Sequence, residues 1–420
     1  MSAPGSGGSI ASRARSPRGA RRRHCIAIIL GVLPISLGIV PTGANHAYAV
    51  APSKDAPLAQ GEPAPNIILG EVVAVSGASV VVGAPLYGVT GQAFVFANTG
   101  ASWHQVADLH GVGAQGGFKF GSSVAISGST VVVGADSADQ GAGRAFVFSK
   151  YGTRWRQTAE LRGRDTSPED FFGTSVSVSG SEIVVGAPQH EGGRAYIFTF
   201  IAGRWHQSEE LKARDNTHHD RFGSSVSLSG SQVVIGAPQH VSGRAYVFAD
   251  ESGGWDQVAE LHGASVATMF GWSVATSETT VVVGALQLAG TGHAYVFDKT
   301  GWGWRMVADL VGRQSAPGAW VGSSVGISGS TVAVGAEGEA SGAGRVYVFT
   351  RAGDRYTQSA ELGPVGRSAN ANFGEAVGLS DDVIVVGLGN LTALGYGQDD
   401  YVFTRGQSGW RNVVELDGRI

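Results

Sequence analysis

The sequence predicts an all-β fold, a seven-bladed β-propeller of four-stranded antiparallel blades. A pattern close to Val-Val-Val-Gly-Ala occurs seven times in 420 residues, at spacings of 48 to 52 residues. A period in this range is typical of propellers and other repeat arrays. The chain also has 65 glycines and only 15% charged residues, a composition that favours strands and turns over helices. The pattern's glycines are Gly83, Gly134, Gly186, Gly236, Gly284, Gly335 and Gly387.

Each repeat contains four short β-like segments. In the third repeat they are residues 174–179, 182–187, 194–198 and 205–211, each rich in Val, Ile, aromatic residues or Ser and bounded by turn residues. Four antiparallel strands make one propeller blade. The valine-rich segment has no polar face, so we expect it to be buried on both sides between neighbouring blades. The predicted repeats are about 66–111, 112–163, 164–213, 214–263, 264–312, 313–364 and 365–420.

The first 49 residues differ from the repeats and predict a secretory signal peptide. Six arginines precede an apolar run from Ile26 to Val40, and Ala47-Tyr48-Ala49 follows as an expected cleavage site. The apolar run is shorter than the ~20 residues of a membrane-spanning helix, which is the alternative interpretation. Residues 50–65 contain four prolines and are predicted to be a flexible lead-in. The mature protein is therefore expected to be secreted and extracellular.

Removal of the leader changes the charge balance. Loss of six arginines from 30 basic residues leaves 24 against 34 acidic residues, a formal charge of −10. Nucleic acid and the membrane surface are therefore not expected as partners of the mature chain. The single cysteine, Cys25, leaves with the leader, so neither disulfide nor thiol chemistry is expected. We expect a monomer.

Two short motifs in each repeat resemble a known family. Phe222-Gly223-Ser224-Ser225-Val226, followed by Val234-Ile235-Gly236-Ala237-Pro238, is similar to the FG-GAP repeat of the integrin alpha-subunit propeller and of many bacterial secreted proteins. Phe-Gly recurs in four more repeats, and in the other two the phenylalanine is replaced, giving Leu69-Gly70 and Val321-Gly322. The resemblance covers residues 66–420 and implies the propeller fold. It says little about activity, because one fold can carry unrelated functions.

The repeats depart from the family at the turn between the first two strands. Repeats of the integrin type often carry a calcium loop there, because a hard cation needs six to eight oxygen ligands. Here the turn is Ser-Gly-Ser in four repeats, and Asp381-Asp382 offers only two adjacent carboxylates in the last one. No cofactor is therefore expected, and calcium at the usual family loops is not expected. The sequence contains no metalloprotease, nucleophile-elbow or phosphate-loop motif, so no catalytic residues are assigned.

A second regularity predicts structural pairs at the rim of the blades. The residue that opens the third strand and a carboxylate near the end of the fourth are always 16 residues apart, which places them opposite or nearly opposite each other in a hairpin. An exposed ion pair of this kind contributes about 0.2–1 kcal/mol. In the two end repeats Gln92 would face Asp108, and Asp399 would face Glu415. The predicted pairs are Arg144 with Glu160, Arg194 with Glu210, Arg244 with Glu260, His293 with Asp309, and Arg345 with Glu361.

The loops that break the repeat are the candidate binding residues. Strand alternation places the loop between the second and third strands on the same face as the connection between blades. Variable loops on a rigid scaffold commonly carry binding. His190 and His240 occupy matching loops of two neighbouring blades, and the segment 215–220 connects those blades. Four histidines are thus expected near one cleft between blades, either as solvated turn residues or as a recognition patch able to bind Zn²⁺. The candidates are His190, His240, Asp215, His218, His219 and Asp220.

Three functional classes follow from the sequence. The first is a secreted, non-enzymatic interaction or adhesion scaffold that binds a protein or surface ligand through one face. The second is a propeller lectin that binds glycans between blades, for which one aromatic residue in the fourth strand of each repeat could stack on a sugar. The common register of these residues instead favours packing along the outer edge of each blade. The third is an enzyme acting on extracellular polysaccharide.

Overall fold

A computed structural model describes residues 72–100, 102–114, 117–251, 253–264, 268–364, 371–389 and 400–416. Chain contacts separate Met1–Pro63 from Ala64–Ile420, and every described residue belongs to the second unit. The expected signal peptide (1–49) and lead-in (50–65) lie outside the described residues. Within the described part of the chain, no helix is long and apolar enough to span a membrane.

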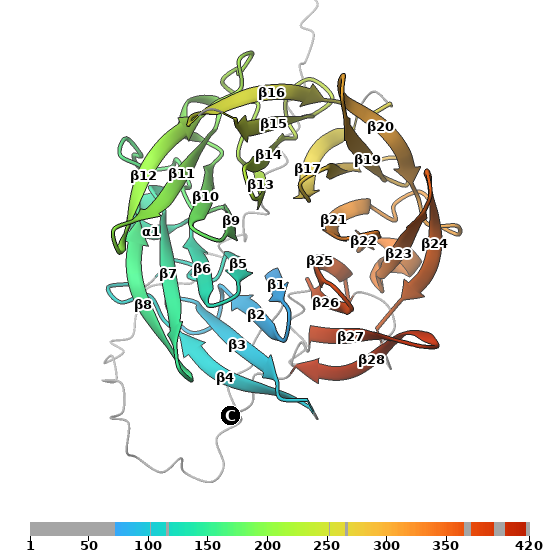
Figure 1. Cartoon of the computed structure of the whole chain (residues 1–420), viewed down its shortest axis with the longest axis horizontal. Coiled ribbons are helices and arrows are strands. Elements are labelled where there is room, and N and C mark those ends of the chain that lie inside the picture. The colour runs from blue at the N-terminus through green and yellow to red at the C-terminus, as the bar shows by residue number, and fades with distance from the viewer. Residues whose placement is uncertain are drawn as a thin grey trace, which may run out of the picture. The chain divides into compact units, whose positions relative to one another are not determined.

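Seven four-stranded antiparallel sheets form a ring around a central axis, which confirms the predicted seven-bladed propeller (Figure 1). Each sheet uses four consecutive strands, with the first strand nearest the axis and the fourth at the periphery. We number the blades 1 to 7 in chain order. The innermost strands of all seven blades line a central channel of about 280 Å³.

The strand bounds are as follows. Blade 1 comprises β1 (Val72–Ser76), β2 (Ser79–Ala84), β3 (Gln92–Asn98) and β4 (Trp103–Leu109), and blade 2 comprises β5 (Ser123–Ser127), β6 (Thr130–Ala135), β7 (Arg144–Tyr151) and β8 (Arg154–Leu161). Blade 3 comprises β9 (Ser175–Ser179), β10 (Glu182–Ala187), β11 (Arg194–Ile201) and β12 (Arg204–Leu211), and blade 4 comprises β13 (Ser225–Ser229), β14 (Gln232–Ala237), β15 (Arg244–Asp250) and β16 (Trp255–Leu261). Blade 5 comprises β17 (Met269–Thr276), β18 (Thr280–Leu286), β19 (His293–Thr300) and β20 (Gly303–Leu310). Blade 6 comprises β21 (Val321–Ser328), β22 (Thr331–Ala336), β23 (Arg345–Ala352) and β24 (Arg355–Leu362), and blade 7 comprises β25 (Phe373–Ser380), β26 (Val383–Leu388), β27 (Asp400–Gly406) and β28 (Gly409–Leu416). Three short helical turns lie in the loops between second and third strands: α1 (Ala138–Gly141), η1 (His190–Gly192) and α2 (Glu339–Gly342).

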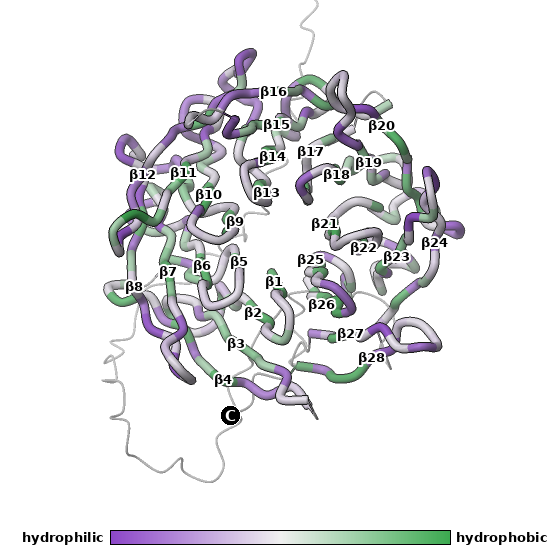
Figure 2. Tube along the Cα trace, in the orientation of Figure 1, coloured by the Kyte–Doolittle hydropathy of each residue, from purple (hydrophilic) through white to green (hydrophobic). Residues whose placement is uncertain are grey.

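Burial differs sharply between the middle and outer strands. The valine-rich second strand is buried along nearly its whole length, as in β10 and β14, whereas the outer strands β8, β12 and β28 alternate between exposed and half-buried residues. Figure 2 shows hydrophobic residues along the middle strands and hydrophilic residues on the outer hairpins. The middle strands therefore form the core between blades, as expected for an apolar run without a polar face.

The hydrophobic core is divided among the contacts between neighbouring blades. One cluster joins Val132 and Val147 of blade 2 to Ile183 and Tyr196 of blade 3. Another joins Val80 of blade 1 to residues of blade 7, which closes the ring. Burying one such side chain contributes about 1.5–3 kcal/mol. No blade could bury these faces alone, so the blades depend on one another for stability.

The two glycine motifs meet at each interface between blades. A Cβ at Gly186 of blade 3 would collide with the backbone oxygen of Gly223, the Phe-Gly glycine of blade 4. The Ser175 hydroxyl donates a hydrogen bond of 2.8 Å to the same oxygen. Gly223 itself has a φ of 90°, which favours glycine. Equivalent contacts link blade 2 to blade 3, and each later pair through blades 6 and 7.

The phenylalanine of each Phe-Gly motif completes the interface. Phe222 is fully buried and packs against Tyr246 and Phe248 of its own blade, with ring centroids 5.6 and 5.9 Å apart. Its backbone also bridges to Gly193, which ends the loop of the preceding blade. Six bridges of this type occur among the described residues, one at each junction from blade 1 to blade 7. The Phe-Gly segment therefore couples the core of one blade to a loop of its neighbour.

We predict that Gly186→Ala destabilises the propeller by about 1–3 kcal/mol or more, because the added methyl group would push the Gly223 backbone away. Denaturant unfolding and the thermal midpoint measure this effect. Gly301→Ala is the matched control, since nothing lies within 4 Å of a Cβ at that position. Equal stability of the two variants would contradict the interface assigned to Gly186.

Candidate functional site

The candidate site lies on the face where second strands end and first strands begin. Loops between second and third strands and connections between blades both open there, and the six Phe-Gly or Val-Gly bridges hold them together. We call this surface the loop face. The opposite face carries the turns between first and second strands and between third and fourth strands.

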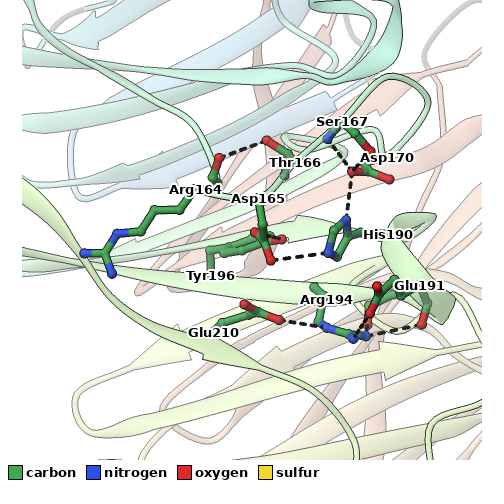
Figure 3. Close-up of polar contacts among 12 residues, drawn as sticks. Arg164, Asp165, Thr166, Ser167, Asp170, His190, Glu191, Arg194, Tyr196 and Glu210 are labelled. Carbon is green, nitrogen blue, oxygen red and sulfur yellow. Dashed lines mark hydrogen bonds and ion pairs between the residues drawn. The ribbon is translucent and has the colours of Figure 1, made fainter.

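In blade 3 the loop face contains a buried histidine between two carboxylates (Figure 3). His190 is 8% exposed, and its Nδ1 lies 2.8 Å from Asp170 Oδ2. Its Nε2 lies 3.4 Å from Asp165 Oδ2. Both nitrogens of the imidazole thus face carboxylate oxygens, which only accept hydrogen bonds when ionised.

Asp165 connects the histidine to a tyrosine of β11. The Tyr196 hydroxyl donates a hydrogen bond of 2.9 Å to Asp165 Oδ1. Burial acts to raise the pKa of Asp165, but the Tyr196 hydrogen bond and the neighbouring His190 hold that pKa below its usual value. Burial, followed by the Asp165 contact, raises the pKa of Tyr196. Asp165 is therefore held as an ionised acceptor beside the imidazole.

Asp170 is fixed by the turn that it closes. Its Oδ2 accepts hydrogen bonds from the Ser167 backbone nitrogen at 2.6 Å and from the Ser167 hydroxyl at 3.0 Å. Such a turn holds a carboxylate with little freedom. The imidazole orientation in blade 3 is thus set by a rigid neighbour.

Blade 4 repeats this arrangement 50 residues later. His240 Nδ1 lies 2.9 Å from Asp220 Oδ2, and Nε2 lies 3.7 Å from Asp215 Oδ2. Asp220 accepts a 2.6 Å hydrogen bond from the Thr217 backbone nitrogen. Burial acts to raise the pKa of Asp220, but hydrogen bonds from Thr217 and the close approach of His240 hold that pKa below its usual value. Burial, followed by the nearby Asp215 carboxylate, raises the pKa of Tyr246.

The sequence candidates are therefore distributed differently from the expected single cluster. His190 and His240 lie in separate clusters, each with the carboxylates of its own inter-blade connection. His218 and His219 are exposed in the connection that carries Asp215 and Asp220. Within the described ranges, one group of three metal-ligating side chains has its ligand atoms within 4.8 Å of one another: Asp165, His190 and Glu210.

Sequence reasoning missed Asp165, Asp170 and Tyr196. The signal was the alignment of two connections: Asp165 and Asp170 precede Phe172-Gly173 at the spacing at which Asp215 and Asp220 precede Phe222-Gly223. Each pair also precedes a Gln-His dipeptide by the same interval. Comparison of the two repeats would have paired each histidine with its own connection.

The five rim pairs are in contact in the structure. Each carboxylate lies opposite the residue two positions beyond its partner, so the pairs are diagonal, as with Glu160 opposite Phe146. A bulge in the fourth strand of each blade adds one of these two positions and so brings both side chains of a pair to the same face of the sheet. The closest atoms are 3.3 Å apart for Arg144 and Glu160, 2.9 Å for Arg194 and Glu210, 2.6 Å for Arg244 and Glu260, 2.8 Å for His293 and Asp309, and 3.2 Å for Arg345 and Glu361.

The first blade uses different partners at the rim. Gln92 Nε2 lies 3.3 Å from His110 Nε2, and Gln105 donates a hydrogen bond of 2.5 Å to Asp108. The expected contact between Gln92 and Asp108 is thus replaced by two neighbouring polar contacts. Asp399, predicted to face Glu415 in the last blade, lies outside the described residues.

The aromatic residues of the outer strands pack against their blades. Trp155 contacts the core cluster between blades 1 and 2, and Lys150 Nζ lies 5.9 Å from its ring centroid. Arg351 similarly lies 5.6 Å from the ring of Tyr356. A groove of about 480 Å³ runs between β4 and β28 and is lined by Trp103, which is largely buried, together with Gln105, Asp108 and Glu415.

Five residues of the loop face are held in a left-handed backbone conformation. Each directly precedes a Phe-Gly or Val-Gly motif, and each has a φ between 48° and 55°. A non-glycine residue in this region costs on the order of 1–3 kcal/mol. Their side chains are two cations, two aromatic rings and one amide: Lys119, Arg221, Phe171, Trp320 and Asn372.

On the same face, Asp136 and Glu337 stand where Gly236-Ala237-Pro238 has its proline. Burial raises the pKa of Glu337 in blade 6 to about 7. In blade 2, burial raises the pKa of Asp136 despite a hydrogen bond from Ser137. Both carboxylates are thus held where their charged forms are poorly solvated.

These features define a class of protein: a seven-bladed repeat propeller whose Phe-Gly and Gly-Ala segments link the blades and whose variable loops share one face. A family model of the FG-GAP repeat matches residues 103–148, 155–198, 205–248, 255–297 and 304–349. The chain therefore belongs to the FG-GAP repeat family, as its motifs predict. Each matched unit runs from the fourth strand of one blade to the third strand of the next, so it contains one complete interface. A search of curated proteins found no match to the chain.

We predict that Glu337 makes stability depend on pH. Between the ordinary pKa of 4.5 and the folded value of about 7, the folded chain binds the proton more tightly than the unfolded chain. The free energy of unfolding should therefore fall as pH rises through that window. From about pH 4.5 to about pH 8, the free energy of unfolding should fall by about 3 kcal/mol less in Glu337→Gln than in the parent, measured by denaturant unfolding.

The exposed Glu169→Gln variant is the control, because its carboxylate is not buried. It should follow the parent at both pH values. A Glu337→Gln variant with the parent's pH dependence would show that Glu337 is solvated in the folded chain.

Proposed function

We propose that this chain is a secreted, non-enzymatic binding scaffold that holds a protein or surface ligand on the loop face. The FG-GAP propeller fold is consistent with a binding scaffold. Because fold does not determine function, the proposal rests on the chemistry of this face. Export rests on the basic and apolar pattern of residues 1–49.

The five left-handed residues before the Phe-Gly and Val-Gly motifs carry the proposal. Glycine would occupy such a position without strain, yet five blades have a cation, an aromatic ring or an amide there. Backbone strain of this kind often accompanies functional sites. The bridges from each following residue to the neighbouring loop keep these positions rigid. A ring of different side chains on a fixed frame is suited to recognising one extended surface.

Exposed apolar side chains occur on the same face. Val89 of blade 1 and Val241 of blade 4 are 79% and 78% exposed at the tips of loops between second and third strands. Val112 and Leu288 are also exposed on this face. Single exposed apolar residues are common, but this face also carries Trp320 and Arg221, so it offers both apolar and charged contacts to a partner.

A glycan is the second candidate ligand, and the groove between β4 and β28 favours it. The groove lies between two blades and offers side-chain oxygen or nitrogen atoms of Gln105, Asp108 and Glu415. Trp103 presents little of its ring there, so polar contacts would dominate. Glycan binding through this groove would be independent of the loop face.

We predict that a loop-face variant loses ligand binding. The variant combines Lys119→Ala, Phe171→Ala, Arg221→Ala and Trp320→Ala, which removes the side chains and leaves each position non-glycine. The probes are labelled residues 50–420 applied to a glycan array and to extracellular surface protein from the natural environment. Specific, saturable binding to a surface protein should fall at least tenfold in the variant.

The control combines Tyr151→Ala, Ile201→Ala and Trp302→Ala in exposed hairpins of the opposite face. It should bind like the parent. Binding that survives the loop-face changes but is lost after Gln105→Ala and Glu415→Ala would instead support the glycan groove. Turnover of a polysaccharide panel would support the enzyme class.

A further inference from the structure

We propose that Asp165, His190 and Glu210 of blade 3 form a binding site for a divalent transition-metal cation of the zinc type. Their ligand atoms lie within 4.8 Å of one another in the described chain. The side chains come from the connection before blade 3, the loop after β10 and the strand β12 (Figure 3). The site is separate from the turns between first and second strands, where the Asp loops of related repeats would lie.

The imidazole is set in the orientation that a metal ligand needs. Asp170 lies 2.8 Å from Nδ1, so a proton on Nδ1 is donated to that carboxylate. The lone pair of Nε2 then points toward Asp165. A carboxylate that holds the distal nitrogen of a histidine is the usual second shell of a metal-bound imidazole. Asp170 is thus a positioning residue and not a ligand.

A neutral imidazole alone does not satisfy this geometry. With its proton on Nδ1, its Nε2 lone pair faces the Asp165 carboxylate at 3.4 Å, which places two acceptors against each other. Either a second proton on the imidazole or a metal cation between Nε2 and Oδ2 would remove the repulsion. Two ligand atoms about 2.1 Å from a tetrahedral zinc ion lie about 3.4 Å apart, which matches the separation between Nε2 and Oδ2.

The local charge also favours a cation. Asp165 and Asp170 lie beside His190, and Glu191 and Glu210 lie beside Arg194, which is the one guanidinium paired within this group. The side chain of Arg164 points away from this group, as Figure 3 shows, and donates to the Gln207 backbone oxygen. Four carboxylates against one cationic side chain leave a net negative site. The mixture of one nitrogen and two oxygen ligands suits Zn²⁺ better than Ca²⁺, which takes oxygen ligands.

Blade 4 provides a natural comparison within the chain. His240 lies beside Asp215 and Asp220, which are equivalent to Asp165 and Asp170. Val241, however, stands where blade 3 has Glu191. In blade 3, Arg194 divides its contacts between Glu191 at 2.8 Å and Glu210 at 2.9 Å. In blade 4, Arg244 lies 2.6 Å from Glu260. Glu210 is thus less tightly held by its arginine and freer to turn toward a metal.

The test is isothermal titration of metal-free residues 50–420 with ZnCl₂ at about pH 7.5. We expect one saturable equivalent. His190→Asn and Asp165→Asn should each weaken it at least tenfold, and the positioning variant Asp170→Asn should weaken it about 10- to 100-fold. His240→Asn should retain the blade 3 equivalent, and His218→Ala is the control for an exposed histidine outside the site.

Circular dichroism of the metal-free variants checks their fold, and zinc should raise the thermal midpoint of the parent and not that of His190→Asn. Absence of saturable binding to the parent would overturn the proposal. Equal losses in His190→Asn and His240→Asn, or unchanged binding in His190→Asn and Asp165→Asn, would also overturn it.

Discussion

The propeller depends on one contact, in which the Gly-Ala glycine of a blade meets the backbone oxygen of the Phe-Gly glycine in the next blade. At Gly186 and Gly223 there is no room for a Cβ, and the Ser175 hydroxyl donates to the same oxygen. The close approach allows the apolar second strands of neighbouring blades to bury each other. One hydrogen bond contributes only about 1 kcal/mol, but the geometry it sets determines how much apolar surface the ring removes from water.

The same contact explains why the loop face can vary. Each Phe-Gly backbone bridges to the glycine that ends the preceding blade's loop. The ends of the variable loops are therefore held by a backbone contact that recurs from blade to blade. A rigid frame can hold strained residues such as Lys119 and Trp320 at left-handed positions. Loops on such a frame can change their side chains without disturbing the core. Within one repeat, the glycines and apolar strands therefore maintain the ring, and the loop side chains are left to vary.

The sequence predicts the ring well because its signal is repeated seven times. A valine run without a polar face must be buried on both sides, and β10 and β14 show that burial. The candidate site was harder to predict, because it depends on which loop contacts which connection. The matching histidines suggested one shared cluster, whereas His190 turns to Asp170 and His240 turns to Asp220. The diagonal geometry of the rim pairs also required a bulge that spacing alone does not reveal.

Differences among blades at equivalent positions are the most informative feature of such a repeat. The position after Gly-Ala is proline in blades 1, 3 and 4 but a half-buried acid in blades 2 and 6. Proline there fixes the backbone without any cost of burying charge, whereas Glu337 is held with its pKa raised to about 7. The contact between Gly335 and Gly374 is nevertheless preserved in blade 6, so the acid does not serve the ring itself. The acids after Gly-Ala and the histidine between carboxylates in blade 3 therefore belong to the variable loops and not to the contact that closes the ring.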